Sequence, residues 1–439
     1  MTMKKFIILA AICAGLTGTL PAGTGGGDEP QAILIKNATI IPVVGDRVDQ
    51  GQLLIRDGKI AGLGKSLAAP DGALVIDAAG LFVYPGFIDG YSHFGLTEIS
   101  AIASTSDVRE MGKENPELRV IWAINPGSVH FGTGRVNGTT AALVAPSGGT
   151  FPGLSALVKM DGWTAQEMAV KEIATSLINF PMSPRPSGGE GGGQKQESKV
   201  DVTSKLVDKI KDYLGEARYY LKLKKDAAAD PKLPTPETNP KYEALAPVLD
   251  GSLPVIISVE KDKDIELAIK FVQDEKLKAI FRGCGQGFKV ADKIKKSGIP
   301  VIIDSLYAGP SDPEDGYDAP WRNVVALAKA GITLCFSSGD DSSAGKDMPY
   351  HAARAVAYGL DHDEAIRELT INPAKILGVD QRLGSLEIGK DADLFITTGD
   401  PLDPKSEVKH LFIGGRHTDM KNYWDNLYEK YKGRPLKKG

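Results

Sequence analysis

The hydrophobic and polar positions of this chain follow two patterns, and the change between them falls near residue 81. Between residues 32 and 84, short apolar or alternating segments are separated by turn-forming pairs, which is typical of β-hairpins. Further on, apolar runs alternate with segments of helical period, such as residues 262–275 and 321–330. Because parallel strands need a long crossover that is usually a helix, this alternation predicts β/α units. A doubly wound sheet and a closed (β/α)8 barrel both fit it.

Strand-like segments return after residue 380, so two β-rich regions bracket one α/β unit. The simplest assembly pairs residues 32–80 with residues 381–416 in one small β-sandwich domain and leaves residues 81–380 as the α/β domain. Residues 181–200 are rich in Pro, Gly and Ser, which predicts a mobile insertion. Residues 417–439 form a basic, aromatic tail.

The first residues have the pattern of a secretory signal. Lys4 and Lys5 precede an apolar run over residues 6–20, and small residues follow it. The run is shorter than the roughly 20 residues that a membrane-spanning helix needs. We therefore predict a signal peptide over residues 1–22, a linker over 23–31 and an exported protein, periplasmic or secreted, with no transmembrane domain once the signal is removed. An uncleaved anchor is the alternative.

The composition excludes several classes of protein. Hydrophobic residues make up 42% of the chain and charged residues 25%, which is typical of globular proteins and excludes global disorder. The 52 basic and 56 acidic residues give a net charge of −4, so no nucleic-acid partner is expected. Two cysteines remain after the signal, Cys284 and Cys335, and two buried thiols are favoured over one disulfide.

Three motifs carry a resemblance to a known family. They are YPGFIDGYSH at residues 84–93, LTINPAKILG at 369–378 and LGSLEIGKDADL at 383–394. In order and spacing they resemble the amidohydrolase superfamily, and in particular its exported, imidazolonepropionase-like members, over residues 32–416. The resemblance implies a TIM-like (β/α)8 barrel with a β-sandwich built from both chain ends. It also implies hydrolysis of non-peptide amide or cyclic amide C–N bonds at the C-terminal ends of the barrel strands. Zinc or another divalent metal would activate the attacking water there.

Most of the metal ligands that the resemblance implies are replaced in this chain. The family has a His-x-His pair on the first strand, a bridging Lys or Glu, a His on each of the fifth and sixth strands, and an Asp ending the eighth. Here Tyr91 takes the place of the first His, His93 remains as a remnant metal ligand, and Leu177 takes the place of the bridging Lys. Tyr91 either ligates a metal or fills the space that the metal left. None of the six histidines lies between residues 131 and 350, where the fifth and sixth strands are expected.

Other residue types stand at the remaining ligand places. The fifth strand is expected to end with Ser258 or Glu260 in the place of a His, and the sixth with Gly283 there. At the end of the eighth strand, Asp340 is the best match to the catalytic Asp and Asp341 the second, with a helix cap as the alternative role. We therefore expect Asp340 and Glu260 to be the candidate catalytic residues. The expected pocket residues are Tyr91, Ser258, Gly283 and Asp341.

Three functions remain open after this comparison. Because ligands are lost from several strands at once, we favour a pseudoenzyme that binds no metal and either binds a small molecule or pairs with an intact amidohydrolase. The second is an active hydrolase with a single metal on His93 and Asp340, although zinc usually takes three or four protein ligands. The third is a metal-free hydrolase with Asp340 and Glu260 as an acid/base pair. A homo-oligomer is open in every case.

Overall fold

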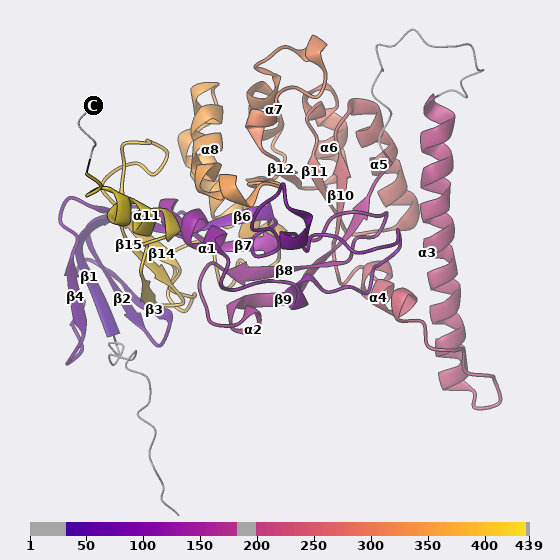
Figure 1. The fold of residues 1–439 in the computed structure, drawn as a ribbon, viewed down its shortest axis with the longest axis horizontal. Coiled ribbons are helices and arrows are strands. Elements are labelled where there is room, and N and C mark those ends of the chain that lie inside the picture. Colours follow the sequence, from indigo (N-terminus) through magenta and orange to yellow (C-terminus); the bar gives the residue numbers. More distant parts are fainter. Residues whose placement is uncertain (1–31, 182–198, 436–439) are drawn as a thin grey trace, which may run out of the picture.

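The computed structural model describes residues 32–181 and 199–435, and in this part of the chain the strands form two eight-stranded sheets (Figure 1). The signal peptide, the linker, most of the predicted insertion and the last residues of the tail lie outside the described residues. No helix within the described ranges is long and apolar enough to cross a membrane.

The first sheet combines strands from both ends of the chain. Its order is β16-β15-β14-β5-β1-β2-β3, with β4 also paired to β1. The strands are β1 (Ala32–Ile40), β2 (Val48–Arg56), β3 (Lys59–Gly64), β4 (Leu74–Asp77), β5 (Phe82–Pro85), β14 (Leu394–Thr397), β15 (Val408–Ile413) and β16 (Arg416–Thr418). The two ends meet where β5 and β14 run antiparallel, with Phe395 opposite Tyr84. Ile35, Leu53 and Phe412 are fully buried in the core of this sheet. The sheet built from both chain ends is thus confirmed.

The second sheet curves into a nearly closed barrel. Its order runs from β13 to β6. The strands are β6 (Phe87–Ser92), β7 (Thr139–Val144), β8 (Leu154–Lys159), β9 (Ala169–Asn179), β10 (Val255–Val259), β11 (Ala279–Gly283), β12 (Val301–Ile303) and β13 (Leu334–Phe336). The two end strands approach each other, because the amide of Gly339, just after β13, donates to the carbonyl of Tyr91 in β6 at 3.1 Å. The predicted TIM-like barrel is confirmed.

One strand departs from the all-parallel pattern. β8 runs antiparallel to both β7 and β9, whereas the other neighbouring pairs are parallel. Antiparallel neighbours need no crossover helix, and between β7 and β9 the chain forms only the short helix α2 (Ala165–Met168). The apolar runs of these strands alone do not distinguish the two directions.

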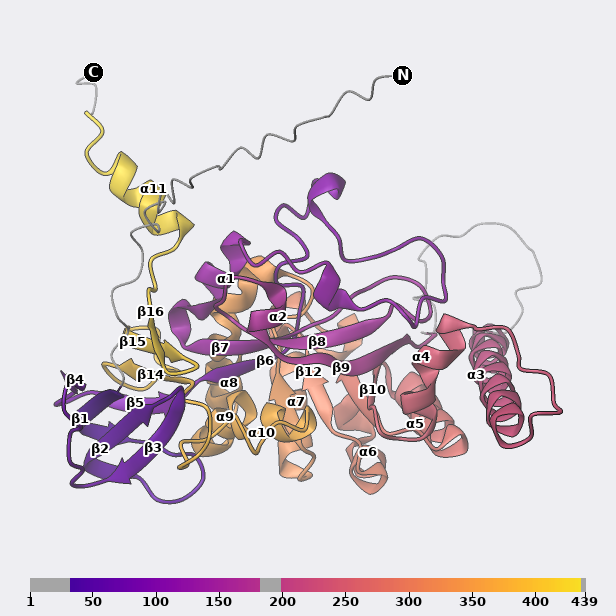
Figure 2. The ribbon, with the colours of Figure 1, turned by 90° about the horizontal axis from the view of Figure 1, so that it is seen from below.

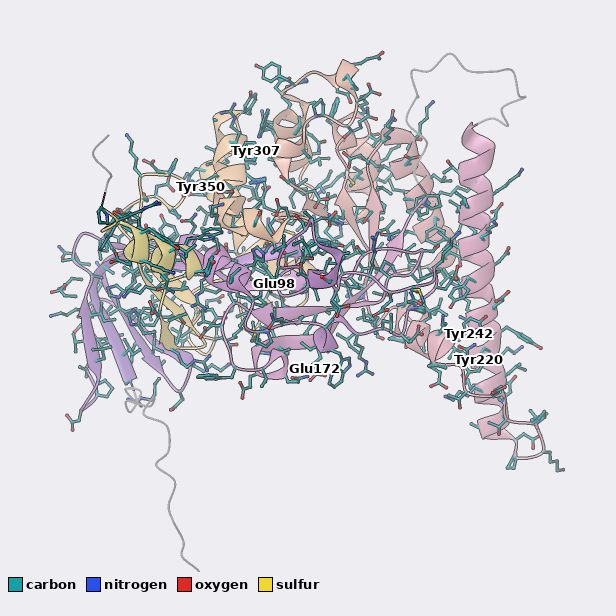
Figure 3. All side chains as sticks on the ribbon, in the orientation of Figure 1. Glu98, Glu172, Tyr220, Tyr242, Tyr307 and Tyr350 are labelled. Atoms are coloured by element: carbon teal, nitrogen blue, oxygen red, sulfur yellow. The ribbon has the colours of Figure 1, made fainter. Side chains whose placement is uncertain are left out.

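The helices cover the barrel unevenly. Beyond α2 they are α1 (Val129–Gly134), α3 (Lys199–Ala229), α4 (Pro240–Leu249), α5 (Asp262–Glu275), α6 (Ala291–Ser297), α7 (Ala319–Lys329), α8 (Met348–Ala357), α9 (His362–Leu369), α10 (Ile371–Ile376) and α11 (Tyr423–Tyr431). Figure 2 shows α5 to α10 on one side of the barrel strands and the long loops after β6 on the other. The long helix α3 lies at the far edge and packs on α4, where Tyr220 and Tyr242 have ring centroids 5.7 Å apart (Figure 3).

The barrel interior is a packed apolar core. Each of the eight strands contributes at least one buried apolar side chain, namely Ile88, Leu143, Leu157, Leu177, Ile256, Ile280, Ile302 and Cys335. A TIM-barrel interior is filled in this way by residues from every strand, so it is not a pore. Cys284 and Cys335 are both free and buried, as predicted.

Candidate functional site

Charged side chains gather where four barrel strands end. Glu260 follows β10, Arg282 lies near the end of β11, Asp304 follows β12, and Asp340 lies shortly after β13. All four line one pocket of about 600 Å³. Because β10 to β13 are parallel, their carboxyl ends open on the same face, which is where TIM-barrel enzymes hold their active sites.

The guanidinium of Arg282 lies at the centre of this group. Its Nε donates to Asp304 Oδ1 at 3.0 Å, and its Nη2 lies 2.9 Å from Asp304 Oδ2, a two-pronged contact that fixes the plane of the group. Nη2 also donates to Asp340 Oδ1 at 2.8 Å. Burial alone would lower the pKa of Arg282, but the negative charges of Asp304 and Asp340 outweigh it and raise that pKa. The side chain is therefore a permanent cation held by two carboxylates.

Tyr91 lies against the guanidinium from the side of the barrel interior. The Cζ atom of Arg282 is 3.6 Å from the centre of the Tyr91 ring, within the range of a cation–π contact. The hydroxyl of Tyr91 donates to the carbonyl oxygen of Pro146 at 3.4 Å, and burial raises the pKa of the phenol to about 12. A neutral phenol packed among the interior residues corresponds to the space-filling alternative for Tyr91, because a metal ligand would have to be an anion.

His93 stands beside this cluster without joining it. The ring is 5% exposed, and its Nε2 lies 3.6 Å from Asp340 Oδ1, beyond hydrogen-bond distance. Among the described residues, Nε2 has no hydrogen-bond partner. Burial is the main influence on the ring and lowers its pKa, so His93 is neutral near pH 7.

The residues of this site do not fit a metal centre. A bound zinc ion usually needs three or four protein ligands, whereas no group of three His, Cys, Asp or Glu side chains within residues 32–181 and 199–435 has a suitable arrangement. The approach between His93 and Asp340 offers two ligands at most. In addition, the charge of Arg282 already neutralises the carboxylate of Asp340 and would repel a divalent cation.

Glu260 lies at the other side of the pocket in close contact with backbone. Its Oε1 accepts a hydrogen bond from Ser311, and burial raises the pKa of its carboxyl group. A Cβ atom on Gly285 would lie 2.2 Å from Oε1, and one on Gly283 would lie 2.7 Å from Oε2. Gly283 also has φ +92°, a conformation that favours glycine. Gly283 lines the pocket, and the absence of a side chain at this position leaves space for the carboxylate of Glu260.

The remaining predicted site residues divide between two roles. Ser258 lines the pocket together with Glu260. Asp341 does not line it, because its Oδ1 accepts from the amide of Ser343 at 2.9 Å and from its hydroxyl at 2.6 Å. It thereby caps the 3-10 helix Ser342–Asp347. Of the two neighbouring acids, Asp340 faces the pocket and Asp341 takes the helix-cap role.

Sequence reasoning missed Arg282, Asp304 and Asp89. Arg282 interrupts an apolar strand, and a charge in such a place is a signal because isolated charges are rarely buried. Asp304 directly follows the apolar strand β12, where the carboxyl ends of parallel strands collect site residues. Asp89 is fully buried, and its Oδ1 accepts from the amides of Tyr91 and Ser338 at 3.1 and 3.0 Å. Burial raises its pKa to about 7.

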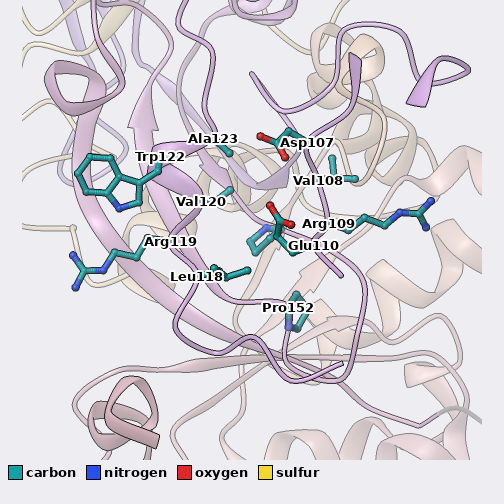
Figure 4. Close-up of a pocket in the computed structure, with 11 residues that line it drawn as sticks. Asp107, Val108, Arg109, Glu110, Leu118, Arg119, Val120, Trp122, Ala123 and Pro152 are labelled. Carbon is teal, nitrogen blue, oxygen red and sulfur yellow. The ribbon is translucent and has the colours of Figure 1, made fainter. Parts of the chain in front are cut away.

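A second hollow lies in the loops that follow β6 and β7. It has a volume of about 250 Å³, and Asp107, Trp122, Pro146 and Pro152 are among its lining residues (Figure 4). Pro146 is also the residue that accepts the hydrogen bond of Tyr91. Tyr91 thus contacts one lining residue of each hollow, Pro146 here and Arg282 in the strand-end pocket.

Comparison of the chain with known proteins identifies related sequences and structures. A model of the amidohydrolase family matches residues 305–418, from the end of β12 to β16. The crystal structure of an amidohydrolase from Thermotoga maritima MSB8 is 26% identical and matches with a TM-score of 0.79, covering 89% of this chain and 100% of that one. The chain belongs to the amidohydrolase superfamily. The superfamily membership predicted from the three motifs is confirmed.

Curated relatives of this superfamily member are distant in sequence. It is 23% identical over 451 residues to the amidohydrolase tasK of Hapsidospora irregularis, an alignment that covers 90% of this chain and 44% of that protein. It is 24% identical over 404 residues to an adenine deaminase of Desulforamulus reducens, covering 88% of this chain and 57% of the deaminase. The chain therefore spans only about half the length of these two relatives.

Proposed function

We propose that this amidohydrolase-superfamily protein binds a small molecule in its strand-end pocket and has lost metal-dependent hydrolysis. The observation that carries the proposal is the position of Arg282. Its guanidinium contacts Tyr91, Asp304 and Asp340. Asp340 in turn lies 3.6 Å from His93, the one residue that remains of the metal ligands on the first strand that the superfamily resemblance implies. A fixed cation can polarise and bind a carbonyl oxygen, but it holds no water molecule as a nucleophile.

The pocket suits a ligand with an amide- or urea-like group. Such a group offers N–H donors and a carbonyl acceptor side by side. The exposed carboxylate of Asp340 and the half-exposed carboxylate of Asp304 can accept from the N–H donors. Arg282 and Lys261, which also line the pocket, can donate to the carbonyl. A hollow of about 600 Å³ is of the usual size for a small-molecule site.

The proposal is tested with a panel of linear amides, ureas, hydantoins and purines. Binding is found by thermal shift and measured by calorimetry, while product formation is followed by chromatography. We expect at least one ligand to bind without turnover and Arg282→Ala to weaken its binding by at least about tenfold. The matched control is Arg218→Ala, which removes an arginine paired with Glu275 on the outside of the barrel. Turnover that depends on added metal, or equal binding by the two variants, would contradict the proposal.

Metal-free hydrolysis is the second candidate, favoured by two carboxyl groups that line the same pocket. The side chain of Asp340 is 64% exposed, whereas burial raises the pKa of Glu260. Asp340 would accept a proton from water as the water oxygen attacks the carbonyl carbon. Glu260 would donate its proton to the leaving nitrogen as the C–N bond breaks. Metal-independent turnover that falls at least about a hundredfold in both Asp340→Asn and Glu260→Gln would establish this candidate over the first.

We also propose that the protein is exported. The proposal rests on Lys4, Lys5 and the apolar run that follows them, which lie outside the described residues. Sequencing the N-terminus of protein recovered from the periplasm or medium should give a start near residue 23, and an intact Met1 on the recovered protein would contradict cleavage. Light scattering of that material, alone and with a metal-containing amidohydrolase, tests the proposed self-association or pairing.

A further inference from the structure

Helix α11 is amphipathic, with all its aromatic residues on one face. Successive residues of a helix are turned by about 100°, so its apolar residues fall within an arc of about 140°. These residues are Tyr423, Trp424, Leu427, Tyr428 and Tyr431. Asp425 and Glu429 point to the opposite side. The helix therefore has one aromatic face and one polar face.

The aromatic face of α11 is not covered by the rest of the described chain. None of the residues of α11 is buried, and its aromatic side chains are 48–68% exposed. Figure 2 shows the helix projecting away from both sheets. Its base is held, because Arg135 Nη2 donates to the carbonyl of Asp419 at 2.7 Å. The segment is thus anchored at residue 419 and presents its aromatic residues to the outside.

The N-terminus of the helix is capped by its own side chains. The side chain of Asn422 accepts from the amides of Trp424 and Asp425 at 2.9 and 3.4 Å, and the side chain of Asp425 accepts from the amide of Asn422 at 3.0 Å. This capping box satisfies N–H groups that would otherwise lack partners. However, isolated helices shorter than about 12 residues are marginal in water. A nine-residue helix with no buried residue therefore gains most from a surface that covers its aromatic face.

Positive charge is concentrated around this helix. Residues 420–439 contain six basic and two acidic residues, a net charge of +4, whereas the whole chain has −4 and the rest therefore −8. On the helix, Lys430 and Lys432 lie just beyond the two borders of the aromatic arc. Lysines in that position can reach past an apolar surface toward anionic groups. Lys432 is paired with Glu429, but such an exposed pair is weak enough to be exchanged.

We propose that α11 docks on the surface of an anionic phospholipid bilayer. Tyrosine and tryptophan prefer the boundary between headgroups and hydrocarbon, and a basic amphipathic helix lies in the plane of that boundary. The aromatic arc enters the boundary, the flanking lysines contact lipid phosphates, and the two acids point away from the membrane. The helix thus attaches the barrel and its pocket reversibly to a membrane without spanning it.

The test is co-sedimentation of the exported, processed chain with vesicles. We expect binding to vesicles of phosphatidylglycerol and phosphatidylcholine, at least about tenfold weaker binding to phosphatidylcholine alone, and release by salt, as expected for an electrostatic contribution. The double variant Trp424→Ser with Tyr428→Ser should lose at least about tenfold of the partition coefficient and keep its melting temperature, since neither side chain is buried.

The matched control is Trp163→Ser with Tyr219→Ser. These side chains are 90% and 65% exposed and lie outside α11, so their loss should leave vesicle binding unchanged. Equal binding of the two double variants, or of the two lipid compositions, would overturn the proposal. So would a wild-type dimer that Trp424→Ser with Tyr428→Ser converts to a monomer, because a second copy of the chain would then cover the aromatic face.

Discussion

Two clusters of ion pairs in this fold both combine basic side chains with aspartates, but they differ in how far the aspartates are buried. The pocket cluster consists of Arg282, Asp304 and Asp340. The junction cluster lies where the small sheet meets the barrel, and consists of Lys59, Lys159, Arg382, Asp391 and Asp393. In the junction cluster the two aspartate side chains are 6% and 4% exposed, whereas in the pocket cluster they are 36% and 64% exposed.

This difference in exposure indicates that the junction cluster stabilises the fold, whereas the pocket cluster is open to a ligand. Asp391 is contacted by Lys59 of β3, Lys159 of β8 and Arg382, at 2.5, 3.2 and 2.9 Å, so its charge joins three separate segments. Asp340 makes one contact with Arg282 and turns the rest of its carboxylate to the pocket. The GKDADL segment, part of one of the three motifs, therefore stabilises the junction, whereas Arg282, Asp304 and Asp340 of the pocket cluster lie outside the motifs.

The largest expected effect is a fall in the free energy of unfolding with rising pH, caused by the buried carboxyl group of Asp89. The pKa of Asp89 is raised to about 7 by burial, against about 3.9 in an unfolded chain. Ionisation is therefore less favourable in the folded state, and up to about 4 kcal/mol of stability is lost between about pH 4 and pH 7. Asp89→Asn should flatten this part of the curve of unfolding free energy against pH. An unchanged slope would show that Asp89 is ionised in the folded protein.

The junction cluster should respond to pH in the opposite direction. Burial raises the pKa of Asp391, but the hydrogen bond from Lys59 and the charges of Lys159 and Arg382 outweigh it and lower that pKa to about 2. The stabilisation is present above about pH 4 and is lost as pH falls toward 2.

Asp391→Asn removes this stabilisation at neutral pH. We expect a loss of about 2–3 kcal/mol in unfolding free energy, less than a fully enclosed pair would lose because Lys59 and Arg382 are nearly half exposed. Urea denaturation at pH 7 measures it. Asp49→Asn breaks an exposed pair with Arg47 and should cost less than about 0.5 kcal/mol. Equal losses in the two variants would contradict the structural role of the junction cluster.

Removing the cation of the pocket cluster should cost less stability than breaking the junction cluster. Arg282→Ala leaves Asp304 and Asp340 facing each other, but water can reach both carboxylates. We expect about 1–2 kcal/mol from the lost hydrogen bonds and the lost contact with Tyr91. Thermal and urea unfolding measure this loss. A loss of unfolding free energy larger than that of Asp391→Asn would mean that the main role of Arg282 is to stabilise the fold and not to bind a ligand.

The smallest expected effect concerns the contact under the guanidinium. Tyr91→Phe keeps the ring beside Arg282 and removes only the 3.4 Å hydrogen bond to Pro146. We expect a change of about 0.5 kcal/mol in stability and less than about threefold in ligand affinity. Urea unfolding and calorimetry check both values. A large loss of affinity would show that the hydroxyl of Tyr91 itself contacts the ligand.

The fold could be predicted from the sequence because hydrophobic positions recur with the periods of strands and helices, and because three motifs lie near the two ends of the barrel segment. Strand-like runs and helical periods predicted β/α units, and the family resemblance carried by the motifs favoured the barrel over a doubly wound sheet. The two β-rich ends predicted the small sheet. The direction of β8 could not be predicted, because an apolar strand buried on both faces reads the same in parallel and antiparallel sheets.

The site could be predicted only in part, for a related reason. Sequence placed Glu260 and Asp340 at strand ends, and the structure brings both to one pocket. It did not indicate that Arg282 points to the centre of the pocket, because a slip of one residue in register turns a strand side chain to the other face. The roles of Asp340 and Asp341 differ through the local turn that caps residues Ser342–Asp347, which the order of residues does not reveal.

The most direct test of the proposal that Arg282 takes the place of a metal ion in this pocket is the metal content of the purified protein. Residues 23–439 are prepared without chelators or nickel resin, dialysed with and without Zn²⁺, Mn²⁺, Fe²⁺, Co²⁺ and Ni²⁺, and analysed by elemental mass spectrometry. We predict less than about 0.1 metal ion per chain in every case, since the described residues offer too few ligands. About one ion per chain that is lost in both His93→Ala and Asp340→Asn would contradict it.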